Sequence, residues 1–226
     1  MTLRMLNKNE RRLADRLAVP DWGRGAWKRL RIRLDGEVER TTRIVWVQTP
    51  LLFADIRVPG PRDTGGQAEG FAGHLVVRGQ VFSWQRPIDL QPPKDPGDEG
   101  AMFRDGDAMV EAGIHANYVE DWKLVGAAEP HLAMSRGHFE ITRDGILWDD
   151  AGPLEIAVAC GGHVIHAWRD DAGAGLAYFA HNPQTDTLKP KLRAGAQDRA
   201  ESGEPWRLWS TTMDEASAEA LADMLA

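Results

Sequence analysis

Residues 44–59 constrain the fold more than any other stretch, because they read as two β-strands that meet at Thr49-Pro50. Side chains in a strand point alternately to opposite faces. One face of the second strand therefore carries Phe53 together with Asp55 and Arg57, while the opposite face is entirely aliphatic. Packing alone does not explain a carboxylate and a guanidinium beside an aromatic ring. The pattern favours a strand that lines a partly polar interior.

The same mixture of aromatic and charged side chains recurs in residues 82–86 and 118–122. Alternation places Trp84 on the face of Arg86, and Tyr118 on a shared face with two neighbours in its strand. Three such strands suit the inside of a β-barrel that holds a small molecule. The predicted ligand-binding residues are Trp46, Phe53, Asp55, Arg57, Trp84, Arg86, Tyr118, Glu120 and Trp122.

Short strands recur along the chain at roughly 10-residue spacing, which favours barrels or a sandwich over βαβ units. They are expected at residues 27–34, 42–48, 51–58, 71–78, 80–86, 114–125, 138–142, 145–148, 154–159, 163–169, 175–180, 186–190 and 206–211.

We expect three regions along the chain. An amphipathic helix over residues 3–18 occupies region 1–21, and residues 22–136 form a first barrel with a linker at 126–137. Residues 137–226 form a second, smaller β unit that ends in a helix. Thr212 and Glu215 have the spacing of a capping box for that helix.

Charge is distributed unevenly along the 226 residues. Residues 1–33 hold ten Lys or Arg against three Asp or Glu, a net of +7, whereas the whole chain carries −7. The basic segment is expected to fold back onto the acidic remainder, so no nucleic-acid partner is predicted. No apolar run approaches the roughly 20 residues of a membrane span. A single cysteine and the lack of a secretory leader predict a cytoplasmic protein, with monomer and homodimer both left open.

Residues that bind metals or act as nucleophiles are sparse. Cys160, His163 and His166 are zinc ligand types, but two histidines three apart on a strand face opposite sides. No serine lies in a G-x-S-x-G elbow. We therefore predict no metal, no cofactor and no assigned catalytic residue. One enzymatic alternative remains, in which Asp55 or Glu120 acts as an acid or base.

Charges inside a barrel must be paired or solvated. An acid–guanidinium network therefore allows two readings. It either fills the barrel as structural pairing, or leaves Arg57 or Arg86 to bind a ligand carboxylate or phosphate while Asp55 and Glu120 hold the arginines in place.

The tripeptide Gly25-Ala26-Trp27 resembles the G-x-W start of calycin barrels, the lipocalin and fatty-acid-binding group, in which the tryptophan closes the barrel floor. Residues 46–49, 58–59, 110–113 and 119–122 look like an uncharacterised family of two unequal lipocalin-like barrels known from fungi. That resemblance implies two β-barrels, no established reaction and no fixed cofactor. This chain departs from it in its basic N-terminal helix and in most of its C-terminal half.

The sequence thus predicts an all-β protein with two antiparallel calycin-like β-barrels and short terminal helices. Its expected function is non-catalytic binding of a small, partly apolar, anionic ligand inside the first barrel. Two alternatives stay open: an isomerase or hydrolase that uses a pocket carboxylate, and a structural or adaptor protein whose barrels are filled by side chains.

Overall fold

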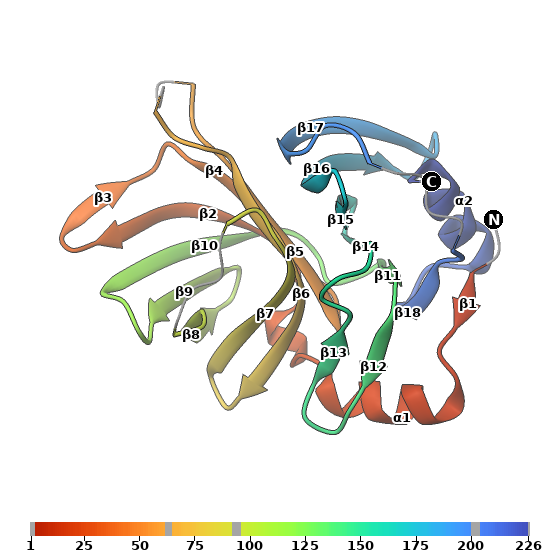
Figure 1. Cartoon of the computed structure of the whole chain (residues 1–226). Helices are drawn as coiled ribbons and strands as arrows, with labels where there is room; N and C mark the ends of the chain where they lie inside the picture. Colours follow the sequence, from red (N-terminus) through yellow and green to blue (C-terminus); the bar gives the residue numbers. More distant parts are fainter. Residues whose placement is uncertain (1–2, 62–64, 92–95, 200–203, 226) are drawn as a thin grey trace.

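The computed structural model describes residues 3–61, 65–91, 96–199 and 204–225. Eight antiparallel strands form a closed barrel, in which each strand pairs with the next and the last returns to the first (Figure 1). They are β2 (Gly25–Leu34), β4 (Arg43–Gln48), β5 (Leu52–Val58), β6 (Glu69–Arg78), β7 (Val81–Asp89), β8 (Glu99–Asp105), β9 (Ala108–Gly113) and β10 (Tyr118–Gly126). A short strand, β3 (Glu37–Glu39), extends the edge of β2. The predicted first barrel is confirmed, and it is consistent with a calycin-like fold.

A second sheet lies beside the barrel and is open. In spatial order its strands are β1 (Arg4–Met5), β18 (Arg207–Thr211), β11 (His131–Arg136), β14 (Leu154–Cys160), β15 (His163–Asp170), β16 (Gly173–Asn182) and β17 (Thr187–Gly195). Within the described residues β1 and β17 do not pair with each other, so the expected second barrel is not found. A separate hairpin joins β12 (Phe139–Ile141) to β13 (Ile146–Trp148).

The second sheet has no need to close, because both of its faces are covered. Along β14, Ile156 and Val158 belong to a core shared with the barrel, whereas Ala157 and Ala159 pack in a cluster with helix α2 (Glu215–Met224). An open sheet with an apolar layer on each side buries its side chains without forming a barrel.

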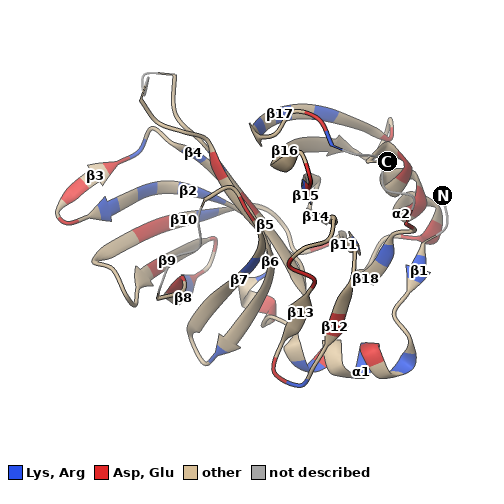
Figure 2. Ribbon diagram, in the orientation of Figure 1, with Lys and Arg blue, Asp and Glu red and all other residues tan. Residues whose placement is uncertain are grey.

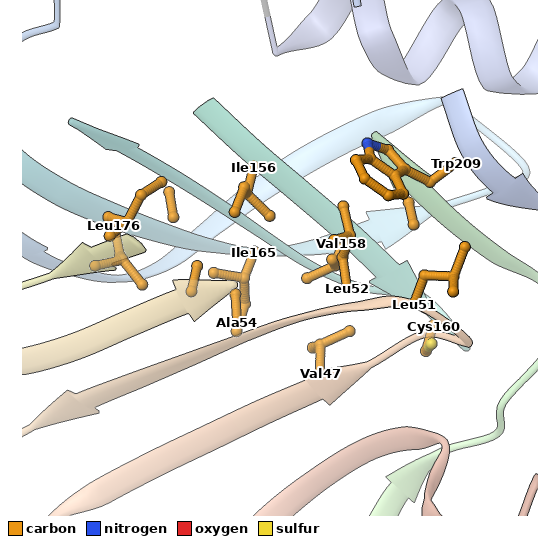
Figure 3. Packing of buried hydrophobic residues seen from close by; sticks show 14 of the residues in the cluster. Val47, Leu51, Leu52, Ala54, Ile156, Val158, Cys160, Ile165, Leu176 and Trp209 are labelled. Carbon is orange, nitrogen blue, oxygen red and sulfur yellow. The ribbon is translucent and has the colours of Figure 1, made fainter. Parts of the chain in front are cut away.

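The shared core joins the outer face of the barrel to the second sheet. From the barrel it takes the aliphatic face of β5, including Leu52 and Ala54, and from the second sheet Ile165 and Leu176 (Figure 3). The period-two pattern of residues 51–58 is therefore confirmed on its aliphatic side. The opposite side of β5 faces the barrel interior, where Phe53 lies in a second apolar cluster.

Both predicted helices exist, with different boundaries or caps. Helix α1 spans Lys8–Leu17, shorter than the expected 3–18, because Asn7 and Glu10 form a capping box at its start. Helix α2 begins after Asp214, whose side chain accepts a hydrogen bond from the Ser217 backbone N–H. The prediction that Thr212 caps it was wrong. A 3-10 turn, η1 (Asp21–Gly23), precedes the barrel, and no helix in the described residues is long and apolar enough to cross a membrane.

The basic N-terminal segment is built into the barrel. Its second half forms β2, where Arg29 pairs with Glu120 and Arg31 pairs with Asp121, both on the neighbouring β10. Figure 2 shows basic residues along β2 beside acidic residues on β10. The expected folding back of this segment onto acidic residues is confirmed for these arginines.

Candidate functional site: the mouth of the barrel

A cavity of about 480 Å³ opens at the end of the barrel where β2 finishes. We call it the mouth pocket. It combines aliphatic side chains with both cations and carboxylates. Its lining residues are Ile32, Leu34, Arg57, Arg86, Pro96, Gly97, Asp98, Glu99, Glu111, His115, Ala116, Tyr118 and Glu120.

The pocket exists partly because β7 and β8 stay together only briefly. Their pairing covers residues 81–83 and 99–101, after which β7 continues in the sheet through its pairing with β6 and carries Arg86 to the mouth. Gly100 makes further room, because a Cβ atom there would lie 2.9 Å from Oε1 of Glu111. Because residue 100 is glycine, the Glu111 carboxyl group can pack closely against β8.

The two arginines of the pocket are both paired with aspartates. Arg57 Nε donates to Oδ1 of Asp55 at 2.8 Å, and Arg86 forms ion pairs with Asp98 and, at 3.6 Å, with Asp89. Burial and the neighbouring guanidinium of Arg57 lower the pKa of Arg86. For Arg57 burial acts in the same direction, but Asp55, with Glu120 and Glu111 beyond it, outweighs burial and raises the pKa.

An aromatic ring supports both guanidinium groups from below. Arg86 lies 3.5 Å and Arg57 lies 4.8 Å from the centre of the Phe71 ring. A ring face attracts a cation electrostatically. Phe71 therefore separates the charged mouth from the apolar interior of the barrel.

Two glutamates face each other across neighbouring strands of the pocket. Glu111 on β9 is directly opposite Glu120 on β10, and their exposed fractions are 4% and 3%. Tyr118 donates to one oxygen of Glu111 at 2.8 Å, and the indole N–H of Trp122 donates to the other at 3.2 Å. Burial, followed by the charge of Glu120, raises the pKa of Glu111 to about 8. At neutral pH the Glu111 carboxyl group is therefore mainly protonated.

Glu120 is paired on one side only. Its Oε1 accepts from Arg29 at 2.7 Å, and Arg29 also binds Glu39 at 2.7 Å. Its Oε2 atom is buried without a hydrogen-bond partner in the described part of the chain, and the same holds for Nε of Arg86. An unmade hydrogen bond on a buried polar atom costs about 1–3 kcal/mol. Two residues that line the pocket thus each carry one buried polar atom with no partner in the described residues, an acceptor on Glu120 and a donor on Arg86.

The structure divides the predicted site residues into two layers. Arg57, Arg86, Tyr118 and Glu120 line the mouth pocket, and Asp55 lies behind Arg57 as its ion-pair partner. Asp55 was expected to hold an arginine in place, and it does. The partner of Glu120, in contrast, is Arg29, which the sequence analysis did not select.

The four remaining predicted residues fill the barrel beneath the pocket. Trp46, Phe53, Trp84 and Trp122 belong to one buried cluster. The Trp46 ring packs edge to face against Trp84 at 6.2 Å and Trp122 at 5.7 Å between ring centres. These rings were expected to be the walls of a cavity. None of them is among the described residues that line the mouth pocket, so they form its filled base.

The residues considered as zinc ligands have separate partners. Cys160 is buried and donates to the Gln48 carbonyl at 3.3 Å, His163 contacts the Tyr178 hydroxyl at 2.7 Å, and His166 contacts Glu155 at 2.8 Å. Among the described residues no three His, Cys, Asp or Glu side chains converge on a common metal position.

Glu111 and Arg29 are the two important site residues that sequence reasoning missed. Glu111 lies in a strand where the sequence predicted none, although Met109 and Glu111 alternate toward the interior. Arg29 follows from a β-bulge: Trp122 pairs with Arg29 and Asp121 with Arg31, so Leu30 has no partner on β10. Arg29 alternates with the inward Trp27, and the bulge puts Ile32 on the same side as Arg29 and leaves Leu30 49% exposed.

Comparison with known proteins supports the fold and little beyond it. No family model and no curated protein matches the chain. A solved structure that does match is the crystal structure of the uncharacterized protein YLR301w from Saccharomyces cerevisiae, with a TM-score of 0.59 and 11% sequence identity. The match covers 83% of this chain and 98% of the yeast chain. At this identity the chain is similar to the yeast protein in fold alone.

Proposed function

We propose that the mouth pocket reversibly binds a small, partly apolar ligand whose acid group contacts Arg86. The observation that carries this proposal is the buried Nε of Arg86, which has no partner among the described residues, on a side chain that lines the cavity. A carboxylate or phosphate oxygen is the natural acceptor for a guanidinium N–H.

The size and lining of the pocket support the same proposal. About 480 Å³ lies within the range of roughly 300–1,000 Å³ that is usual for small-molecule sites. Ile32, Leu34, Pro96 and Ala116 offer apolar surface on the rim. The apolar part of the ligand would rest there, while its acid group reaches down to the charged layer above Phe71.

Calorimetric titration with saturated fatty acids of increasing chain length and with aromatic acids tests this function. We expect at least one acid to bind wild-type protein. The variant Ala116→Phe, which adds a ring at the rim of the pocket and leaves its charged residues unchanged, should weaken that binding about ten-fold or more. Leu147→Phe adds the same ring at an exposed position of β13 and should leave binding unchanged. Equal binding by both variants would place the ligand elsewhere.

Acid–base catalysis is a second candidate, and the carboxyl pair favours it. Glu111 and Glu120 share one cavity, and the raised pKa of Glu111 leaves it able to donate a proton near neutral pH. Asp55 suits this role less well, because its carboxylate forms an ion pair with Arg57. Turnover of a panel of glycosides and esters by wild-type protein, abolished in Glu111→Gln, would support an enzyme. Binding without turnover would support the first proposal.

A further inference from the structure

Resting on the proposed binding function, we propose that the ligand is zwitterionic: besides the acid group at Arg86 it carries a protonated amine that binds between Glu111 and Glu120. The ligand class is thus an amino acid whose amine and acid groups are separated by an apolar chain or ring.

The first support is the unused oxygen of Glu120. Arg29 engages Oε1, whereas Oε2 is buried without a partner in the described residues, on a side chain that lines the cavity. A buried carboxylate oxygen is stabilised most by a charged donor. An ammonium group seated beside Glu120 would supply that donor.

The second support is the balance of charge around the pocket. Four acidic side chains line it, namely Asp98, Glu99, Glu111 and Glu120. Asp98 shares Arg86 with Asp89, and Glu120 shares Arg29 with Glu39, so the acids around the pocket outnumber the cations. His115 contacts Glu99 at 3.0 Å. A ligand that carried only a carboxylate would add a further acid to this set. A zwitterion adds no net charge and places its cation beside the surplus carboxyl groups.

Binding of the ligand's ammonium group should also change the protonation of Glu111, because of the groups that surround this carboxyl group. Tyr118 and Glu120 face it from β10, and Asp55 and Arg57 act on it from β5. In the empty pocket burial and the charge of Glu120 keep Glu111 protonated up to a pKa of about 8. An ammonium group beside both glutamates favours the ionised form, so its binding should release the Glu111 proton to the buffer.

A matched set of probes tests the proposal: 6-aminohexanoate, 6-hydroxyhexanoate, hexanoate and hexylamine, with the homologues one and two methylenes longer and shorter. Binding is measured by calorimetry at pH 7.5 in two buffers of different ionisation enthalpy. We expect the amino acid of the best length to bind about ten-fold more tightly than the acid, alcohol and amine of equal length. We also expect it to release a substantial fraction of one proton for each molecule bound.

Variants assign the effect to the two glutamates. Glu120→Gln keeps an oxygen for Arg29 but should abolish the preference for the amino acid over the plain acid, and Glu111→Gln should abolish proton release. Glu140→Gln, at an exposed position of β12, is the matched control. Should Glu120→Gln fail to fold, proton release by the wild-type protein and by Glu111→Gln decides the matter.

The outcomes separate this inference from the proposed function. If hexanoate or a homologue binds while the amino acid binds no better than the acid or the hydroxy acid, the proposal of a zwitterionic ligand is wrong. The proposal that the mouth pocket binds an acid is then retained. If no probe of any length binds, the proposed function fails together with the inference. Tight binding of hexylamine without need of an acid group would leave the glutamates as the site and would contradict the role of Arg86.

Discussion

At the scale of single residues, the mouth of the barrel is governed by how each charge is compensated. Arg57, Arg86 and Glu120 each have an oppositely charged neighbour. Glu111 instead receives two neutral donors, the hydroxyl of Tyr118 and the indole of Trp122. Within the described residues Glu111 lies next to another acid and forms no ion pair with a cation, and burial together with Glu120 raises its pKa, so it is held as a neutral acid.

The first prediction concerns the pH dependence of stability at Glu111. Its pKa is about 8 in the folded protein against 4.5 as the reference value, so ionisation favours the unfolded chain. Stability from this group is fully present below pH 4.5 and is lost as the pH rises toward 8. Glu111→Gln cannot ionise, and between pH 5 and pH 9 it should gain stability over wild type by on the order of 1–3 kcal/mol.

Urea unfolding of wild type and Glu111→Gln at both pH values measures this difference, with Glu140→Gln as the exposed control. A variant whose stability runs parallel to that of wild type across the range would show that Glu111 is not held in its neutral form.

For single residues, the sequence predicted which face of a strand a side chain lies on wherever the period of two continued without a bulge. The phase of Asp55 and Arg57 on β5 followed from the period of two, and the structure places their aliphatic neighbours in the opposite core. Arg29 could not be predicted, because a bulge at Leu30 changes the phase of β2, and a bulge depends on how β10 pairs with it. The unused atoms of the pocket likewise depend on contacts between distant strands.

At the scale of elements, hairpin β12–β13 contacts the barrel through His74 as well as through Ile141 and Ile146, which are buried in the shared core. The backbone N–H of Ile146 donates to Nε2 of His74 at 3.1 Å, and the Trp148 ring lies 6.5 Å from the imidazole between ring centres. Burial lowers the pKa of His74 to about 4. The nitrogen must be unprotonated to accept the hydrogen bond, so neutral His74 holds the hairpin in place.

The second prediction is loss of this attachment in acid. The folded pKa of His74 is depressed below the reference value of 6.5, so its contribution is present above pH 6.5 and is lost as the pH falls toward 4. Between pH 7 and pH 4.5 wild type should lose on the order of 2 kcal/mol more stability than His74→Gln. Thermal unfolding of both proteins at the two pH values tests this.

His138→Gln provides the matched control, because His138 lies on an exposed site next to β12. A parallel decline of wild type and His74→Gln in acid would remove His74 as the cause.

Elements with strong alternation were predicted well, and elements with mixed composition were not. Strands β8 and β9 carry glycine and charged residues and lie where the sequence predicted no strand, and β11 lies in the expected linker. Their pairing is what makes them strands: β8 and β9 complete the barrel, and β11 lies between β14 and β18. Tertiary context overrides local propensity in such strands.

At the scale of the whole molecule, the barrel and the open sheet are held together by one apolar layer. Val47, Leu52, Ala54 and Ile56 from the barrel share a cluster with residues of the second sheet, among them Ile165 (Figure 3). A common core predicts that the two parts unfold in a single transition. The sequence indicated two β units but not this layer, because the aliphatic face of a strand does not reveal its partner.

The third prediction is that Ile165→Ala destabilises both parts together. Ile165 is fully buried in the shared layer, so removing its side chain should cost about 2–4 kcal/mol. Guanidinium unfolding followed by circular dichroism and by tryptophan fluorescence should give one midpoint, shifted equally in both signals. Ile114→Ala, at a site 46% exposed, is the control. Separate midpoints would show that the barrel is stable without the second sheet.

The central claim is that the mouth pocket is a binding site, and a crystal structure of the protein with the tightest-binding acid from the titration tests it most directly. We expect the acid group within about 2.7–3.2 Å of Nε of Arg86, with the apolar part against Ile32 and Leu34. An acid bound at another place, or a pocket occupied by the protein's own side chains with Arg86 Nε engaged by one of them, would contradict the account.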